Sequence, residues 1–291
     1  MRIGVVFPQT EIGSDPIVLR DYAQAAEDLG FTHLLAYDHV LGADPDRPGG
    51  WTRAYNNATT FHEPLVLFGY LAGLTSKIEF VTGILILPQR QTALVAKQAA
   101  QVDLLSGGRL RLGVAVGWNA VEYEALGESF DTRGRRIGEQ MTVLRKLWTE
   151  ESVDFQGKWH SIPKASINPL PVQRPIPLWM GGGSEPVIKR LARTSDGWFP
   201  QFKPAEPASK EIMERLHGYI QEAGRQTEDV GIEGRINLSD GTPEDWGQGL
   251  QDWQDIGATH LAINTMGLGL GTPRDHIEAI RRFKETTPQY V

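Results

Sequence analysis

Short apolar runs alternate along the chain with stretches in which apolar residues recur at helical spacing. The clearest case is residues 78–118: an apolar run at 78–87, a helical stretch stopped by Ser-Gly-Gly at 106–108, and a second apolar run at 110–116. Strand, helix, turn and strand over ~30 residues or more form a βαβ unit with parallel strands. Neither run alternates between apolar and polar residues, which is typical of strands buried on both faces. The segment therefore predicts an α/β protein.

The same alternation continues and predicts eight strands, each followed by a helix or a long loop. The strands begin near residues 3, 33, 78, 110, 176, 197, 231 and 259. Helical patterns occupy residues 16–29, 62–72, 89–105, 133–148, 186–193, 210–223, 243–256 and 273–286. Eight parallel strands with alternating helices close into a (β/α)8 TIM barrel, so we expect one such domain over residues 1–291. An open doubly wound sheet is the alternative that the pattern leaves open.

Two segments interrupt this alternation. Residues 119–176 hold one clear helix, and the rest is rich in turn-forming residues. We interpret this segment as an insertion after the fourth strand that carries a short hairpin. Residues 41–60 contain several Pro, Gly and Asn residues with little periodicity. A loop of this length is usually functional or disordered.

Composition narrows the function classes. The chain has 291 residues, 40% hydrophobic and 22% charged, and a net charge of −7 without a basic block, so neither nucleic acid nor a membrane surface is an expected partner. The absence of cysteine excludes disulfides and a thiol nucleophile, and the histidines lack metal-ligand spacing, so no metal site is expected. The start MRIGVVFPQ resembles a strand rather than a secretory signal, and no apolar stretch reaches the ~18 residues of a membrane span. These features favour a cytoplasmic enzyme.

The 78–118 segment also carries a sequence motif, T-G-x-x-x-x-P followed by A-K-Q-x-A-x-x-D-x-L-S-G-G-R-L-x-L-G-V-x-x-G-W. It resembles the signature of the bacterial-luciferase-like monooxygenase superfamily, and looser matches run from Met1 to about residue 285. The resemblance implies a barrel that binds FMN or the deazaflavin coenzyme F420. The residues that carry it are Thr82, Gly83, Pro88, Ala96, Lys97, Gln98, Ala100, Asp103, Leu105, Ser106, Gly107, Gly108, Arg109, Leu110, Leu112, Gly113, Val114, Gly117 and Trp118.

His39 is the first candidate for a catalytic residue. Active sites of barrels lie at the C-terminal ends of the strands, and His39 follows the second strand. Imidazole titrates near neutral pH, so it can exchange the proton that accompanies hydride transfer. A loop histidine bonded to the backbone is the alternative. The resemblance implies that the pair Asp38 and His39 matches the deazaflavin-dependent branch, with the histidine beside the cofactor ring. Asp38 either fixes the tautomer of the His39 imidazole or caps a loop.

A glycine-rich turn is the candidate phosphate site. Gly181, Gly182, Gly183 and Ser184 lie between a strand and a helix. Glycines let main-chain amides approach a phosphate, and the helix dipole favours its charge. Such turns also occur for packing alone, and Ser184 is a plausible N-cap. The resemblance implies that the cofactor phosphate binds here.

The resemblance points to two further cofactor contacts. It implies a non-prolyl cis peptide between Gly83 and Ile84, behind the flavin ring. At the end of the fourth strand, Gly117 and Trp118 are expected to wall the cofactor or substrate pocket, and packing of Trp118 under the insertion is the alternative.

The chain departs from two groups of the family. The sugar-phosphate dehydrogenases have a carboxylate directly after the glycine that ends the fourth strand. Here Trp118 stands there and Glu122 is the nearest carboxylate, so that activity is in doubt. The alkanesulfonate monooxygenases carry an active-site cysteine, which this chain lacks.

A charged cluster at residues 133–139 has two interpretations. It binds an anionic substrate or closes a lid, or it is a solvated helix face or an interface, and we favour the second interpretation. The cluster comprises Arg133, Arg135, Arg136 and Glu139.

These observations predict an oxidoreductase that transfers a hydride between coenzyme F420 and a small organic substrate, and we expect a homodimer. The preference for F420 rests on Asp38 and His39 followed by the long loop. The first alternative is an FMN-dependent monooxygenase that uses reduced flavin and O2, and the second is a non-catalytic flavin-binding barrel. A phosphosugar barrel enzyme without flavin fits the glycine turn but leaves the 78–118 motif unexplained. Neither the substrate nor the direction of hydride transfer follows from the sequence.

Overall fold

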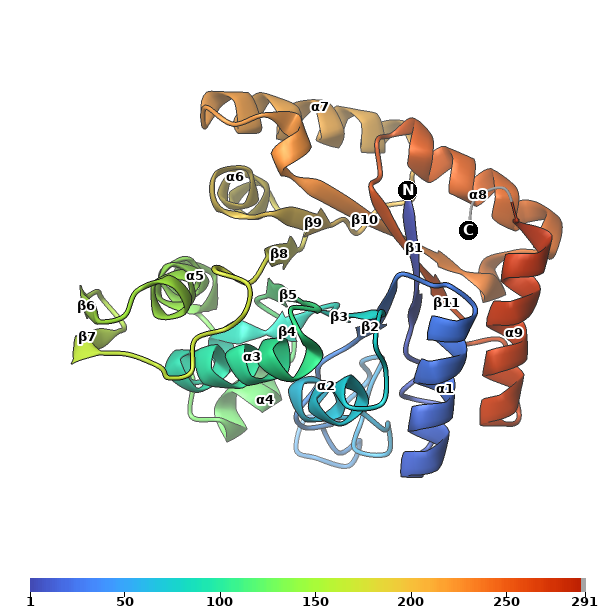
Figure 1. Ribbon diagram of the computed structural model, residues 1–291, viewed down its shortest axis with the longest axis horizontal. Helices are drawn as coiled ribbons and strands as arrows, with labels where there is room; N and C mark the ends of the chain where they lie inside the picture. Colours follow the sequence, from blue (N-terminus) through green and yellow to red (C-terminus); the bar gives the residue numbers. More distant parts are fainter. Residues whose placement is uncertain (289–291) are drawn as a thin grey trace.

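The computed structural model describes residues 1–288 and shows a closed parallel barrel (Figure 1). Its strand order is β3-β2-β1-β11-β10-β9-β8-β5-β4, and the additional pairing of β3 with β5 closes the ring. The predicted barrel is therefore confirmed, and the open sheet is wrong. The strands are β1 (Arg2–Val6), β2 (His33–Ala36), β3 (Glu79–Thr82), β4 (Leu85–Ile86), β5 (Leu110–Ala115), β8 (Leu178–Gly181), β9 (Gly197–Phe199), β10 (Gly231–Asn237) and β11 (His260–Asn264).

Helices surround the barrel. Of the nine α-helices within residues 1–288, six have a proline in the first turn, where its missing N–H costs no hydrogen bond. The α-helices are α1 (Pro16–Asp28), α2 (Pro64–Ala72), α3 (Thr92–Ser106), α4 (Ala120–Ala125), α5 (Arg133–Thr149), α6 (Glu185–Thr194), α7 (Pro207–Glu222), α8 (Pro243–Asp255) and α9 (Pro273–Thr286). The 3₁₀ helices are η1 (Leu87–Gln89), η2 (Thr227–Asp229) and η3 (Leu238–Asp240). No helix within residues 1–288 has both the length and the hydrophobicity that crossing a bilayer requires.

The barrel separates two apolar regions. Most of the core lies between the strands and the helices, and every residue of β5 is buried. A smaller cluster joins four strands through Val6, Leu35, Val81 and Ala262. Successive side chains of a strand point to opposite faces, so this second cluster fills the barrel interior.

The barrel interior also holds a buried charged layer. Glu233 of β10 accepts hydrogen bonds from His33 Nε2 of β2 (2.9 Å) and from Arg111 of β5. The Arg111 guanidinium also lies 4.3 Å from the ring centre of Trp179. Burial opposes charge on Glu233, but Arg111 and His33 outweigh it and lower the pKa of Glu233 to about 2. Burial, reinforced by Arg111, lowers the pKa of His260 to about 3.

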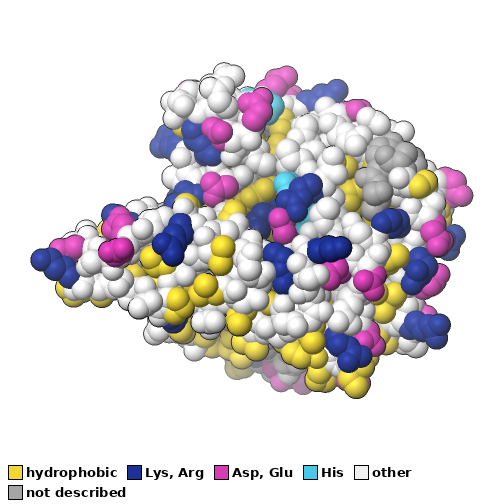
Figure 2. Space-filling view, viewed as in Figure 1, with side chains coloured by type: hydrophobic (Ala, Val, Ile, Leu, Met, Phe, Trp, Pro, Cys, Tyr) yellow, Lys and Arg dark blue, Asp and Glu magenta, His cyan; other side chains and the backbone are white. Residues whose placement is uncertain are grey.

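The insertion carries the predicted hairpin, formed by β6 (Val153–Gln156) and β7 (Ser161–Ala165), which projects from the barrel in Figures 1 and 2. Glu139 of α5 holds its turn, accepting the amides of Lys158, Trp159 and His160 at 2.8 Å each. The ring of His160 bridges Glu139 (2.7 Å) and Thr92 (2.7 Å). Over the face in Figure 2, acidic and basic side chains are intermixed without an extended basic patch.

Candidate active site

A cavity of about 780 Å³ opens at the C-terminal ends of the barrel strands. This volume is in the range of sites that hold a cofactor or small molecule. The cavity brings together the ten residues that the sequence proposes as catalytic or cofactor-binding, from four separate strand ends. They are Asp38, His39, Gly83, Ile84, Gly117, Trp118, Gly181, Gly182, Gly183 and Ser184.

His39 follows β2 and is held by a carboxylate from the insertion. Its Nδ1 lies 3.0 Å from Glu122 Oε2, and the Glu122 side chain is completely buried. The other oxygen, Oε1, accepts the amides of Val40 (2.6 Å) and Leu41 (3.1 Å). Glu122 comes from α4, a six-residue helix that the apolar pattern did not reveal. Sequence reasoning named Glu122 only as the nearest carboxylate and missed this contact.

Aromatic side chains surround the ring of His39. Ring centres lie at 4.8 Å for Phe61, 5.2 Å for Tyr55 and 5.4 Å for Trp118. Trp51 stacks on Trp118 at 5.9 Å and donates from Nε1 to the carbonyl of Tyr55 at 2.6 Å. The 41–60 loop therefore covers the His39 end of the cavity with aromatic surface. Trp118 lines the cavity and is 41% exposed.

The hydrogen bonds of Asp38 go to the segment after β4 and to Arg90. Its Oδ2 accepts the amide of Ile86 (2.8 Å), and its Oδ1 accepts Arg90 (2.7 Å), which also binds Glu63 at 2.8 Å. Burial raises the pKa of Asp38, although Arg90 and the Ile86 amide favour its charged form. Asp38 thus anchors the segment after β4, and Glu122 rather than Asp38 contacts the ring of His39.

The peptide between Gly83 and Ile84 is cis, as predicted. It faces the glycine turn closely, because a Cβ on Gly181 would lie 3.0 Å from Ile84 Cγ2. Gly117 has φ +63°, and a Cβ there would lie 2.7 Å from Ile86 Cγ2. Glycine at positions 117 and 181 therefore lets neighbouring strand ends approach each other closely.

The glycine turn lies on the same cavity as His39, at the start of α6. Gly182 has φ +118°, which disfavours any residue with a Cβ, and its carbonyl accepts Trp198 Nε1 at 2.7 Å. A Cβ on Gly183 would meet nothing within 4 Å. Ser184 is the N-cap, without a side-chain capping bond. Main-chain amides at a helix start lack intrahelical partners, so the turn fits an anionic group such as a phosphate.

A further part of the cavity lining comes from the last two strands, which sequence reasoning did not include. Arg235 of β10 donates to the hydroxyl of Tyr37 at 2.8 Å, and Asn264 of β11 donates to Asn237 Oδ1 at 3.0 Å. Met266 completes this part of the lining. Applying the strand-end rule to all eight strands would have found these residues.

The arginine cluster of residues 133–139 does not line the cavity. Arg136 is buried, against our expectation of a solvated face, and pairs with Glu128 at 2.8 Å. The guanidinium of Arg133 lies 3.5 Å from the ring centre of Phe130. These contacts hold α5 in place, so the cluster does not serve as an anion site of the cavity.

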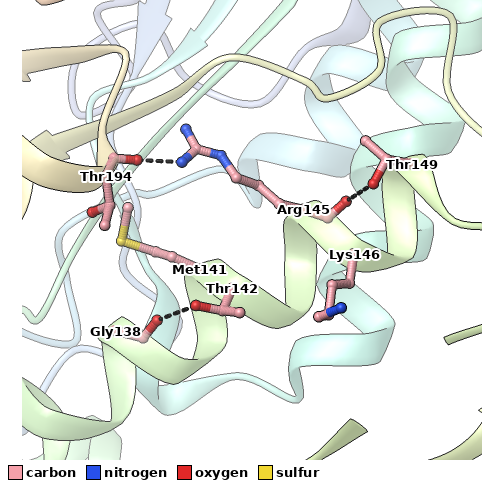
Figure 3. Close-up of a pocket in the computed structure, with 7 residues that line it drawn as sticks. All are labelled: Gly138, Met141, Thr142, Arg145, Lys146, Thr149 and Thr194. Atoms are coloured by element: carbon pink, nitrogen blue, oxygen red, sulfur yellow. Dashed lines mark hydrogen bonds between the residues drawn. The ribbon is translucent and has the colours of Figure 1, made fainter. Parts of the chain in front are cut away.

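A second cavity of about 220 Å³ lies between α5 and α6 (Figure 3). Its strongest donor, Arg145, already binds the carbonyl of Thr194 and, at 2.8 Å, Asp196. Lys146 is paired with Glu150 at 2.8 Å. This cavity therefore offers no free charged group for a ligand. Over residues 1–288, no group of three or more His, Cys, Asp or Glu side chains is arranged to hold a metal ion.

The barrel fold agrees with the comparisons with known proteins. A sequence model described as luciferase-like monooxygenase matches residues 1–239, and the chain belongs to this family, whose members are oxidoreductases and monooxygenases. An uncharacterized protein of Mycobacterium tuberculosis is 30% identical over 274 residues, which are 90% of this chain and 92% of that protein. The FMNH2-dependent dimethylsulfone monooxygenase of Pseudomonas putida is 30% identical over 197 residues, 66% of this chain and 51% of that enzyme.

Solved structures share the fold at low sequence identity. The monooxygenase RslO1 from Streptomyces bottropensis superposes with a TM-score of 0.82 at 18% identity, covering 100% of both chains. The coenzyme F420-dependent tetrahydromethanopterin reductase from Methanopyrus kandleri has a TM-score of 0.74 at 15% identity and covers 96% of both chains. Proteins of this fold thus include both F420-dependent and FMNH2-dependent enzymes.

Proposed function

We propose that the protein transfers a hydride between coenzyme F420 and a small organic substrate, with His39 exchanging the accompanying proton. One observation carries this proposal: a histidine with one nitrogen held by a buried carboxylate shares a single cavity with a glycine turn suited to a phosphate. Groups that exchange protons with a substrate must reach it in the same cavity as the cofactor. Here both features lie at the ends of barrel strands.

The residues present fit a deazaflavin or a flavin. The main-chain amides from Gly182 to Ser184 would hold its phosphate, and the surface at Gly83 and Ile84 would support its ring. When bound, the cofactor supplies the hydride chemistry, while the protein orients it and excludes water. The aromatic surface around His39 serves this exclusion.

The substrate that we propose is uncharged where it meets His39. The nearby Asp38 is paired with Arg90, and Glu233 is paired with Arg111. Arg235, the arginine that lines the cavity, is itself partnered, because it donates to the hydroxyl of Tyr37 at 2.8 Å. An uncharged carbinol or carbonyl group therefore suits the aromatic end of the cavity better than a phosphate ester does.

An FMN-dependent monooxygenase is the second candidate, because the Pseudomonas putida relative at 30% identity is named FMNH2-dependent. In that case the aromatic loop would shield a reduced flavin from water. A non-catalytic flavin-binding barrel is the third candidate, and it requires the same cofactor contacts without turnover. We also propose a single domain over residues 1–291 and a homodimer.

Side-by-side anaerobic titration with F420 and FMN, in both redox states, tests the cofactor. We expect F420 to bind at least about tenfold more tightly, a difference of about 1.4 kcal/mol. Hydride transfer is then followed by deazaflavin absorbance with a panel of uncharged alcohols, ketones and enones. Tighter binding of FMN, together with substrate-dependent oxygen uptake in a separate aerobic assay with reduced FMN, would support the monooxygenase instead. Binding of either cofactor without any turnover would favour the non-catalytic barrel.

A further inference from the structure

We infer that Glu122 is a positioning residue that fixes the tautomer of His39 and directs its unprotonated Nε2 toward the substrate. The inference rests on the proposed function, since it explains how His39 would exchange a proton there. It concerns a carboxylate four positions after Trp118, on the insertion rather than on a barrel strand.

The hydrogen bonds of Glu122 identify it as an acceptor. Its Oε1 receives two main-chain amides, from Val40 and Leu41, and an amide can only donate. This pattern suits an ionised carboxylate, whose Oε2 is then an acceptor for His39 Nδ1 at 3.0 Å. The neutral ring accordingly carries its proton on Nδ1 and a lone pair on Nε2.

The other nitrogen of the ring is free for the substrate. Among the described residues, His39 Nε2 has no hydrogen-bond partner, and His39 lines the cavity. Its side chain is 10% exposed, so the ring meets the cavity over a small area. The flanking rings of Tyr55, Phe61 and Trp118 restrict its rotation. A substrate oxygen in the cavity therefore meets an acceptor nitrogen of fixed direction.

This arrangement defines the proton transfer. Oxidation of a carbinol breaks its O–H and C–H bonds and leaves a carbonyl. His39 Nε2 would take the O–H proton, and an oxidised deazaflavin, when bound, would supply the acceptor for the hydride of the C–H bond. The imidazolium that results is stabilised by the Glu122 carboxylate on its other nitrogen. In the reverse direction the imidazolium would return the proton to the carbonyl oxygen, and a bound reduced deazaflavin would be the hydride source.

Glu122 also ties the histidine to the loop that covers it. The amides it binds, Val40 and Leu41, start the 41–60 loop, and Asn119 Nδ2 donates to the carbonyl of Leu41 at 3.3 Å. The Glu122 carboxylate is thus held by the amides of Val40 and Leu41 in addition to His39 Nδ1. The ring of His39 is aligned by the same group that places the loop entrance.

Glu122→Gln tests the inference because it preserves shape and reverses one hydrogen bond. The amide oxygen of glutamine still accepts Val40 and Leu41, but its NH2 must donate to His39 Nδ1, which moves the ring proton to Nε2. Glu124→Gln, at an exposed site on the same helix, is the matched control. The tautomer is read from ¹⁵N NMR of histidine-labelled protein, with the His39 signals assigned by their loss in His39→Asn.

We expect the Nδ1–H form in the wild type and in Glu124→Gln, and the Nε2–H form in Glu122→Gln. For carbinol oxidation, Glu122→Gln should lower kcat by about 10²–10³-fold, with KM and the cofactor Kd within about threefold. A wild-type ring that carries its proton on Nε2 would overturn the inference, whether or not the variant folds. A variant with the switched tautomer and an unchanged kcat would overturn it as well. The NMR measurement needs no cofactor, so it holds even where the deazaflavin proposal fails.

Discussion

At the scale of single residues, the geometry of the site depends on which carboxylate hydrogen-bonds to the ring of His39. His39 follows a strand end, so its place on the cavity could be predicted from the sequence. Its partner Glu122 is 83 positions away, and no local pattern marks such a pair. Asp38, the obvious neighbour, instead holds the amide of Ile86 and Arg90. The sequence left open whether Asp38 fixes the tautomer of His39 or caps a loop, because adjacency in the chain does not tell whether two side chains meet.

His39→Asn should lower kcat by about 10²–10³-fold, because the substrate proton loses its acceptor. Asparagine fills less of the aromatic enclosure, yet the glycine turn is untouched, so we expect cofactor binding within about threefold of wild type. Steady-state kinetics and a cofactor titration check both expectations.

His62→Asn is the control, since His62 binds the carbonyl of Gly13 and does not line the cavity. Equal rates for both variants and the wild type would favour a barrel in which the histidine takes no part in turnover.

At the scale of elements, prediction from the sequence was most accurate for segments long enough to show a regular apolar pattern. Eight of the nine strands of the barrel sheet begin within two residues of a predicted start, and the ninth, β4, lies inside the apolar run at 78–87. The helix α4 was missed because six residues are too few to display a helical period. The glycine turn was recognised, since a Gly-rich segment between a strand and a helix has a definite stereochemical use. The wall formed by β10 and β11 was missed, although both strands had been placed correctly.

Gly183→Ala separates folding from cofactor binding. Its Cβ would meet nothing within 4 Å, so the unfolding temperature should stay close to that of wild type. The same methyl group would stand over the turn where we place the phosphate. We expect the cofactor Kd to rise by about tenfold or more, about 1.4 kcal/mol, measured by equilibrium titration.

Gly182→Ala is the contrasting variant. With φ +118°, alanine there is strained, so it should lower stability by about 1–3 kcal/mol in urea unfolding. Cofactor binding that is unaffected in both variants would place the phosphate elsewhere.

At the scale of the whole molecule, the charged layer inside the barrel links stability to pH. The pKa of His260 is about 3 in the fold, against 6.5 for the free side chain. Below pH 6.5 the unfolded chain therefore binds a proton that the folded chain does not, so stability falls as the pH drops. Glu233, with a pKa of about 2 against 4.5, adds a second loss as the pH drops below 4.5.

We predict that the urea midpoint decreases steadily from pH 7 to about pH 4. His260→Phe keeps an aromatic ring against Trp179 and removes the titrating group, so its midpoint should fall less over pH 7 to about 5. Parallel curves for the variant and the wild type would show that His260 does not contribute to the acid sensitivity.

The outer surface offers a test of the proposed homodimer. Val66 and Tyr70 of α2 are 68% and 42% exposed, and Leu94 of the neighbouring α3 is 52% exposed. Apolar surface gathered on adjacent helices favours association with a second copy. Light scattering should give twice the monomer mass for the wild type and a smaller mass for Val66→Glu. A monomeric wild type at micromolar concentration would contradict the homodimer.

The carboxylate of Glu122 has a practical consequence for remodelling this enzyme. The loop at 41–60 and the short helix α4 are far apart in the chain, but each supplies half of one hydrogen-bonded junction. A chimera that receives a foreign loop alone would keep Glu122 as the acceptor, but the main-chain amides that donate to it would be displaced. Attempts to change substrate scope by transplantation should therefore exchange both segments together, as one module.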